Sequence, residues 1–333
     1  MTGTNTASSV RVQVTGVGLA LPGATSAAEL LRDTPAPAGP FDTAEVIGKR
    51  GHRYKDRATQ LALCAAIDGL RDAGLIPAGS EELAVSGADM GVVASSNLSN
   101  LDTVCGAAEQ INRESVGAIS PMGLPNASSN VVASTIAIRF KLHGPNLMLC
   151  NGPTSGLDAV HWAANLIAAG RIRRALVIGV ETHNEIVEGL LRTEAAELLD
   201  GAVALVVESA EAAAERGATP AAELGGYRRQ AGLGDCLDTL LAGQAQPEPA
   251  VPGVWFTPER YAPAGAAPMP ESVPRHDLSR AFGRASGALG VLQCAAATGW
   301  LAAQGAGQAL VTNGDDSADA VASLLLSRPG AGS

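Results

Sequence analysis

A proline stands at position 153, inside a stretch whose other residues are typical of a reactive turn. Residues 146–150 have the pattern of a strand, residues 151–154 that of a tight turn, and a helix of small residues begins at Ser155. A turn of this kind commonly presents a nucleophile at a helix N-terminus, where free amides stabilise negative charge. Proline has neither a nucleophilic atom nor a backbone N–H. The segment therefore has the setting of a catalytic turn without the residue that performs catalysis.

Two neighbouring side chains could serve as nucleophiles of an acyltransferase or a hydrolase, namely Cys150 and Ser155. Alternation along the strand favours a packed core thiol for Cys150. No Gly-x-Ser-x-Gly pattern surrounds Ser155. His161 lies on the apolar helix after the turn, which favours a core role, and His183 follows a strand end with no partner at a fixed spacing. Stoichiometric acyl transfer to the chain would support this enzymatic alternative.

The order of these segments resembles the beta-ketoacyl synthases of the thiolase superfamily, whose active-site motif runs roughly Thr-Ala-Cys-Ser-Ser-Gly-Leu. Laid on that motif, Asn151-Gly152-Pro153-Thr154-Ser155-Gly156-Leu157 puts Pro153 at the acyl-accepting cysteine. The resemblance covers most of the chain. It includes the family's opening strand (12–22), the start of its first long helix (54–60), the strand after the nucleophile helix (174–181) and the last strand of the first half (200–208).

The resemblance implies two histidines and a lysine that this chain lacks. The region of the first histidine, residues 254–259, contains none. Ser279 stands at the lysine position and Arg284 at that of the second histidine, and an arginine that stays protonated cannot shuttle a proton. Residues 313–316 replace the family's Gly-Phe-Gly-Gly turn. The combined loss indicates that the chain does not condense acyl groups by itself.

This pattern resembles the chain-length factors of type II polyketide synthases, which are ketosynthase-like subunits that lack the cysteine and form a heterodimer with a catalytic ketosynthase. The implied role is to complete the acyl tunnel and limit the length of the polyketide. Those proteins usually carry glutamine where this chain has Pro153, and they are longer, so we expect a divergent branch such as one that serves a polyene-forming system. A homodimeric acyl-binding scaffold that kept the fold is the remaining alternative.

In chain-length factors the segment that matches residues 120–130 lines the tunnel at the heterodimer interface. Small side chains there predict an open tunnel, with Met122 or Leu124 forming its end wall; an ordinary loop and helix cap is the alternative. In the family fold the strand 146–150 pairs with its counterpart across the interface. The predicted tunnel residues are Met122, Leu124, Asn126, Ala127, Ser128 and Val131, and the predicted interface residues are Asn146, Met148 and Cys150.

Composition limits the possible partners. The chain has 333 residues, 46% of them hydrophobic, and a net charge of −10, which argues against nucleic acid and an anionic membrane face. An acyl carrier protein is also acidic, so we expect it to dock mainly through the catalytic partner, and the basic run 171–174 reads most simply as a solvated helix end. Five cysteines without paired spacing predict reduced thiols in the cytoplasm, with no metal and no cofactor. No signal peptide is visible in residues 1–9, and no apolar run approaches the roughly 20 residues of a membrane span.

Alternating strands and helices predict an α/β protein. The resemblance implies a thiolase-like fold with two pseudo-repeated halves, residues 1–208 and a shortened 209–333, in α/β/α/β/α layers. Strands are predicted at 10–19, 90–95, 146–150, 175–181, 202–208, 223–229, 254–256, 309–312 and 320–326, and helices at 58–73, 100–111, 131–140, 155–169 and 286–303. Proline- and alanine-rich loops are predicted at 244–252 and 261–274.

Overall fold

The computed structural model describes residues 10–34, 38–52, 54–243, 251–262, 268–304 and 307–330. Ten strands form one sheet in the order β3-β2-β4-β5-β1-β6-β10-β9-β7-β8. The predicted loops 244–252 and 261–274 lie partly outside the described residues.

The two ends of this sheet repeat one topology. The first five strands are β1 (Val12–Ala20), β2 (Met90–Ser95), β3 (Asn146–Leu149), β4 (Arg174–Glu181) and β5 (Gly201–Ser209), and the next five are β6 (Ala222–Gln230), β7 (Val254–Phe256), β8 (Arg275–His276), β9 (Gln308–Asn313) and β10 (Val321–Ser327). The orders β3-β2-β4-β5-β1 and β8-β7-β9-β10-β6 correspond strand by strand. In each half three strands run parallel and the last two pair antiparallel. The halves join where Gln13 and Val14 of β1 pair with β6.

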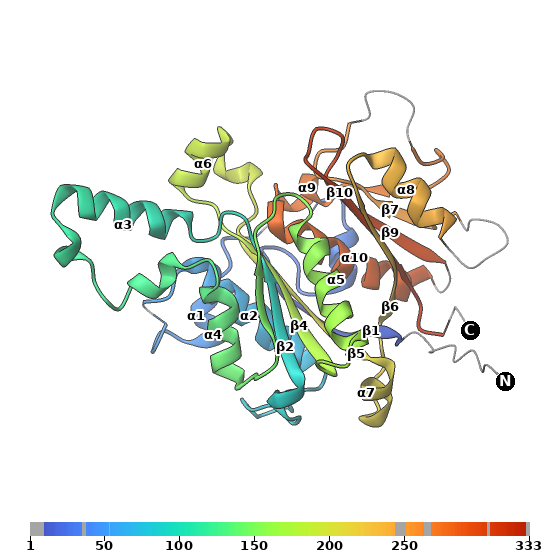
Figure 1. Ribbon diagram of the computed structural model, residues 1–333, viewed down its shortest axis with the longest axis horizontal. Coiled ribbons are helices and arrows are strands. Elements are labelled where there is room, and N and C mark those ends of the chain that lie inside the picture. Colours follow the sequence, from blue (N-terminus) through green and yellow to red (C-terminus); the bar gives the residue numbers. More distant parts are fainter. Residues whose placement is uncertain are drawn as a thin grey trace, which may run out of the picture.

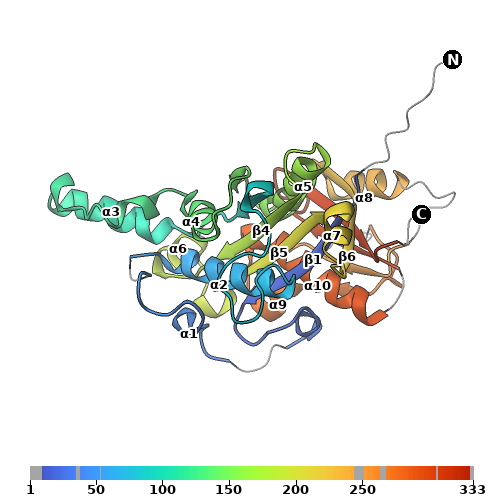
Figure 2. The same ribbon diagram turned by 90° about the horizontal axis from the view of Figure 1, so that it is seen from below.

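Helices complete the layers (Figures 1 and 2). Helix α2 (Arg57–Asp72) covers the outer face of the first half, α8 (Leu233–Ala242) covers the outer face of the second, and α5 (Ser155–Ala168) and α10 (Leu289–Gln304) lie between the halves. Alternate residues of the strands divide among three hydrophobic clusters, because successive strand side chains point to opposite faces. The predicted fold class, a layered thiolase-like α/β fold, is confirmed. The division at residue 208 falls next to the end of β5 and stays a prediction.

Helices α5 and α10 cross at two glycines. A Cβ atom added to Gly156 would lie 2.6 Å from the backbone nitrogen of Gly290, which real Cβ atoms do not allow. Gly156 is the second residue of α5 and Gly290 the second residue of α10, so the two N-termini meet at equivalent positions of the two halves. This close approach brings the turn before α5 next to the segment before α10.

One expectation about membranes needs correction. The helical stretch Ser286–Gln304 has 19 residues and is long and apolar enough to span a membrane, although the sequence analysis found no run that approached this length. It is 78% buried within the protein, and α10 contributes residues from Leu289 to Leu301 to the central core. Its apolar character is therefore explained by its place between the two halves of the sheet.

The arm is a segment that leaves the body of the molecule, and it comprises α3 (Leu101–Arg113) and the residues up to 130 (Figures 1 and 2). None of the thirteen residues of α3 is buried. The chain returns through the 3₁₀ turn η4 (Leu124–Ala127) to α4 (Val131–Phe140), which packs on α2. The remaining helices are short: α1 (Thr43–Ile47), α6 (Glu185–Leu191), α7 (Ala210–Glu215) and α9 (Leu278–Phe282).

Candidate functional site

A pocket of about 320 Å³ gathers most of the positions at which the family resemblance implies catalytic residues. Pro153 comes from the turn before α5, Glu259 follows β7, Arg284 precedes α10, and Gly314 and Asp315 follow β9. These segments are far apart in sequence, and the fold brings them together because α5 and α10 begin side by side. Among the described residues that line the pocket, none carries a thiol or an imidazole.

An ion pair lies where the family resemblance implies two histidines. Arg284 Nε donates to Glu259 Oε2 at 3.3 Å. The other oxygen of Glu259 accepts from the backbone amides of Ala285 at 2.7 Å and Ser286 at 3.3 Å. The Arg284 backbone is fixed as well, since its amide donates to the Glu197 carbonyl and its carbonyl accepts from Leu199. These contacts give Arg284 a structural role, and Glu259 was not predicted from the sequence, because its partners lie some 25 residues away.

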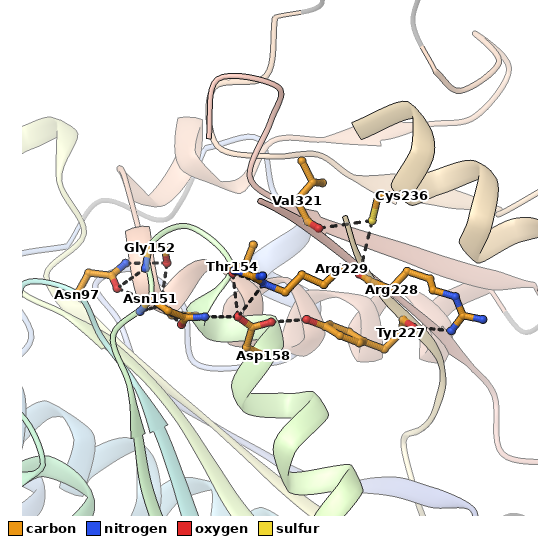
Figure 3. A network of polar contacts seen from close by, with 11 residues as sticks. Asn97, Asn151, Gly152, Thr154, Asp158, Tyr227, Arg228, Arg229, Cys236 and Val321 are labelled. Carbon is orange, nitrogen blue, oxygen red and sulfur yellow. Dashed lines mark hydrogen bonds and ion pairs between the residues drawn. The ribbon is translucent and has the colours of Figure 1, made fainter. Parts of the chain in front are cut away.

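Asn97 holds the turn that carries Pro153 (Figure 3). Its side-chain oxygen accepts from the Gly152 amide at 3.2 Å, and its Nδ2 donates to the Gly152 carbonyl at 3.0 Å and to Ser286 Oγ at 2.9 Å. Gly152 has φ +85°, a conformation that favours glycine. Asn97 thereby ties the Pro153 turn to the segment before α10, a role that no motif in the sequence indicated.

Asp158 anchors the first turn of α5 to the second half of the chain (Figure 3). Its carboxylate accepts from Asn151 Nδ2, from Thr154 Oγ1 at 2.8 Å and from the Tyr227 hydroxyl, and Arg229 lies 3.6 Å away. Burial, together with the bond to Asp158, raises the pKa of Tyr227. The neutral phenol therefore remains the donor, and β6 is fixed against α5.

Glu181 is a buried carboxylate beside the same turn. Its oxygens accept from the amides of Asn97 at 2.6 Å, Leu98 at 3.1 Å and Gly287 at 3.0 Å, and from Ser96 Oγ at 2.9 Å. Burial raises the pKa of Glu181 to about 7, against the opposing effect of these donors. The residue connects the segment after β2 to the one before α10.

The structure separates the two alternative nucleophiles. Cys150 is exposed, so the interpretation as a packed core thiol is wrong, because β3 is an edge strand with no neighbour on its outer side. The pKa of Cys150 is raised by desolvation and by Glu181, which disfavours the reactive thiolate. Ser155 is fully buried, and its hydroxyl contacts Asn151, Gly152 and Asn97.

The two histidines considered in the sequence lie outside the pocket. His161 stacks on Tyr227 with ring centroids 3.9 Å apart, and burial lowers its pKa. His183 lines a different cavity of about 660 Å³. Ser279, predicted with the degenerate positions, lines this second cavity as well, and its hydroxyl donates to Asp277 and accepts from the Arg260 amide at 3.0 Å. The described residues include no group of three or more metal-ligating side chains.

The predicted tunnel residues lie in the arm and at the start of α4. Met122 is 63% exposed and Leu124 57% exposed, so in the chain alone they do not enclose a tunnel. Asn126, Ala127 and Val131 are half-buried, and Ser128 is exposed. The predicted interface residues Asn146, Met148 and Cys150 lie on or directly after β3, at the edge of the sheet.

Comparison with known proteins agrees with this architecture. Residues 38–218 match the family model "Beta-ketoacyl synthase, N-terminal domain", and because the match spans more than half of the chain, the protein belongs to the beta-ketoacyl synthase family. The 3-oxoacyl-[acyl-carrier-protein] synthase 2 of Vibrio harveyi is 28% identical over 210 residues, which are 56% of this chain and 49% of that protein. The granaticin polyketide beta-ketoacyl synthase 1 of Streptomyces violaceoruber is 28% identical over 264 residues, which are 65% of this chain and 62% of that protein. The chain thus spans about half to three fifths of the length of these relatives.

Solved structures show the same fold. The ishigamide ketosynthase/chain length factor has a TM-score of 0.75 at 24% identity, covering 96% of this chain and all of that chain. A type II polyketide synthase acyl carrier protein in complex with its ketosynthase has a TM-score of 0.73 at 18% identity, covering 96% and 99%. At these identities the likeness concerns the fold.

Proposed function

We propose that the protein is a non-catalytic, ketosynthase-like subunit that forms a heterodimer with an active ketosynthase and limits the chain length of a polyketide, in the manner of a chain-length factor. The observation that carries this proposal is the pocket of Pro153, Glu259, Arg284 and Asp315. By the motif resemblance the pocket corresponds to a ketosynthase active site, and it contains the Arg284–Glu259 ion pair but no thiol or imidazole among the described residues that line it.

The charges in this pocket disfavour the donor substrate of a condensing enzyme. A malonyl group carries a carboxylate, and the pocket presents the carboxylates of Glu259 and Asp315 against the single guanidinium of Arg284, which is already paired with Glu259. Like charges at close range raise the free energy of the bound state. Because Pro153 also lacks an N–H, the turn cannot donate a hydrogen bond to a developing oxyanion from that position. Both the binding of a malonyl group and the stabilisation of an oxyanion are therefore disfavoured in this pocket.

Two surfaces support a heterodimer. Strand β3 is an edge strand whose four residues are all only half-buried, and an open edge presents unpaired backbone groups to another chain. The arm exposes apolar side chains, among them Val104, Ile111, Val116 and Met122. Exposed apolar groups concentrated in one segment mark an interaction surface. The solved ketosynthase/chain length factor that shares the fold makes a ketosynthase the natural candidate for this partner.

The tunnel follows from the same assembly. Residues 122–131 would line it once a partner covers the arm, with Met122 or Leu124 at its end. The acyl carrier protein would dock mainly through the ketosynthase, and a cytoplasmic location stays a prediction. The acidic chain makes a poor carrier-protein surface, since its net charge is −10.

Affinity purification from the native producer, followed by mass determination, tests the proposal. We expect a one-to-one complex with a ketosynthase that retains its cysteine and histidines. Recovery of the chain as a self-sufficient homodimer would contradict the proposal and favour a scaffold. Acyl transfer to the chain itself, localised by peptide mass spectrometry to Cys150, would instead favour the enzymatic alternative.

A further inference from the structure

Asn100 occupies the N-cap position of α3 and does not cap the helix. Asparagine is preferred at this position because its side-chain oxygen accepts from an amide of the first turn. Asn100 makes no such bond. Its Nδ2 instead donates to the carbonyl oxygens of Asn126 at 3.4 Å and Ala127 at 3.2 Å, in the returning part of the arm. The side chain therefore connects the two ends of the arm.

The carbonyls that Asn100 contacts belong to η4, the turn that carries the predicted tunnel residues. A second contact holds η4 from the other side, because Asn126 Nδ2 donates to the carbonyl of residue 54, in the loop before α2. Within η4 the amide of Asn126 donates to Gly123 and that of Ser128 donates to Pro125, at 3.0 and 3.1 Å. An otherwise exposed 3₁₀ turn is thus fixed by two asparagine side chains.

The side chains of Asn100 and Asn126, which hold η4, are here named the clamp. The segment that leads to Asn100 is bonded to the turn of the pocket. Residues 96–100, here named the bridge turn, follow β2 and lead into α3. Glu181 binds the backbone of Asn97 and Leu98, and Asn97 binds both backbone groups of Gly152, next to Pro153. Asn100 ends the bridge turn and reaches η4. The distance between the Pro153 turn and η4 is therefore set by five residues whose polar groups are bonded at both ends.

We infer that Asn100 is a positioning residue that fixes η4 relative to the Pro153 turn and thereby keeps the product at one length. This inference rests on the proposed function, since η4 matters for length only if it walls the tunnel. Its physical basis is the loss of two carbonyl bonds: without them η4 fluctuates, and the tunnel end is no longer at one depth.

Three variants test the inference. Asn100→Ala removes the donor, and Asn100→Asp keeps the shape of the side chain but places an oxygen against the two carbonyls. Asn112→Ala is the matched control, because Asn112 is an exposed asparagine of the same helix whose side chain makes no hydrogen bond among the described residues. Each variant is examined as the full chain and as the complex that co-purifies with it.

Hydrogen exchange measures how firmly the clamp holds η4, and this measurement does not depend on the proposed function. In both Asn100 variants the amides of residues 126 and 128 should exchange about five-fold faster, and in Asn112→Ala they should not change. Unchanged exchange in the Asn100 variants overturns the inference whatever the partner is. Exchange measured on Asn100→Asp keeps the test valid if Asn100→Ala does not fold.

Product analysis tests whether loss of the clamp changes the distribution of chain lengths. With the complex intact, the Asn100 variants should release a mixture of chain lengths, with the share of off-length products at least about two-fold above that of the wild type and of Asn112→Ala. One unchanged length despite faster exchange overturns the role in length control. Absence of a ketosynthase from the wild-type complex would instead count against the proposed function and leave the exchange result to decide on the clamp.

Discussion

Glu181 has four donors around its carboxylate and is only 3% exposed, so burial disfavours its charge while the four hydrogen bonds stabilise it. Its pKa is raised to about 7, above the usual value of 4.5, so the folded state binds a proton more tightly than the unfolded state does. Stability from this group is fully present below about pH 4.5 and is lost as the pH rises towards 7, by about 3 kcal/mol in total.

We therefore predict that the free energy of unfolding of the wild type falls between pH 5 and pH 7 relative to that of Glu181→Gln. The variant cannot titrate, but its amide places two donors among donors, so it should be less stable than the wild type at pH 5 by about 1–3 kcal/mol. Urea unfolding of both proteins at pH 5, 6, 7 and 8 measures the difference. Parallel curves across this range would show that Glu181 keeps an ordinary pKa.

Pro153 departs most clearly from the family motif. Placing a thiol at this position tests whether a nucleophile alone is enough for acylation. Pro153→Cys returns a nucleophile and an N–H, but the thiol meets the Arg284–Glu259 pair where imidazoles would be needed. We expect an acylation rate at least about 100-fold below that of the ketosynthase partner, since general acid and base catalysis contributes that much or more. Intact-mass measurement after incubation with an acyl thioester reports it, with Pro258→Cys as a control thiol in the same pocket. Rapid, site-specific acylation of the Pro153→Cys variant would mean that the proline alone prevents acylation at this site.

The sequence predicted residues of this site only where they stand in place of a residue of the family motif. Pro153 and Arg284 are visible because they interrupt a motif, and the structure brings both to one pocket. Glu259, Asn97 and Asn100 could not be found, because their partners lie between 25 and 189 residues away and follow no fixed spacing. Cys150 was misjudged because alternation along a strand does not say whether the strand has a neighbour on its outer side.

Among the elements, η4 gives the most direct test of the predicted tunnel. Ala127 is half-buried and small, and Ala127→Trp would place a large side chain where the growing acyl chain is predicted to extend. We expect a shorter polyketide from the complex that contains this variant. Mass spectrometry of the products measures it, with Ala214→Trp at an exposed position of helix α7, outside the arm, as the control. Unchanged product length in an intact complex would remove the tunnel assignment of residues 122–131.

The arm permits a second test at this scale. Val104 and Ile111 are 40% and 43% exposed and lie seven residues apart, on one face of α3. Replacing both by lysine should cost the isolated chain no more than about 1 kcal/mol, because neither side chain is buried, yet weaken the complex at least about ten-fold. Titration with the purified ketosynthase measures the affinity, and Val10→Lys, which is 47% exposed before β1, serves as the control. Equal affinities would place the interface elsewhere.

Several element boundaries could be predicted from apolar runs in the sequence. The predicted ranges 90–95, 131–140 and 254–256 match β2, α4 and β7 residue for residue. Helices α1, α6, α7, α8 and α9 were missed, because they are short or contain glycine and owe their stability to tertiary packing. The two-residue strand β8 exists only through its pairing with β7, which no local pattern encodes.

At the scale of the whole molecule, the duplicated topology explains why the pocket at Pro153 lies where it does. Equivalent helices α5 and α10 follow equivalent strands β3 and β8, and their first turns meet at Gly156 and Gly290. The pocket opens beside this crossing, between the segments that precede the two helices. Sequence resemblance implied the two halves, but it could not supply the contact between glycines 134 residues apart.

The crossing should be the least tolerant place in the fold. In Gly156→Ala the new methyl group lies 2.6 Å from a backbone nitrogen and cannot be relieved by a rotamer change, so the two halves must separate. We expect a loss of about 3 kcal/mol or more in the free energy of unfolding, measured by urea titration. Gly189→Ala is the matched control: it lies in helix α6 with open space at its Cβ position and should gain up to about 1 kcal/mol. If both variants changed stability equally, the contact between α5 and α10 would not hold the halves together, and the shared strand pairing of β1 with β6 would have to do so.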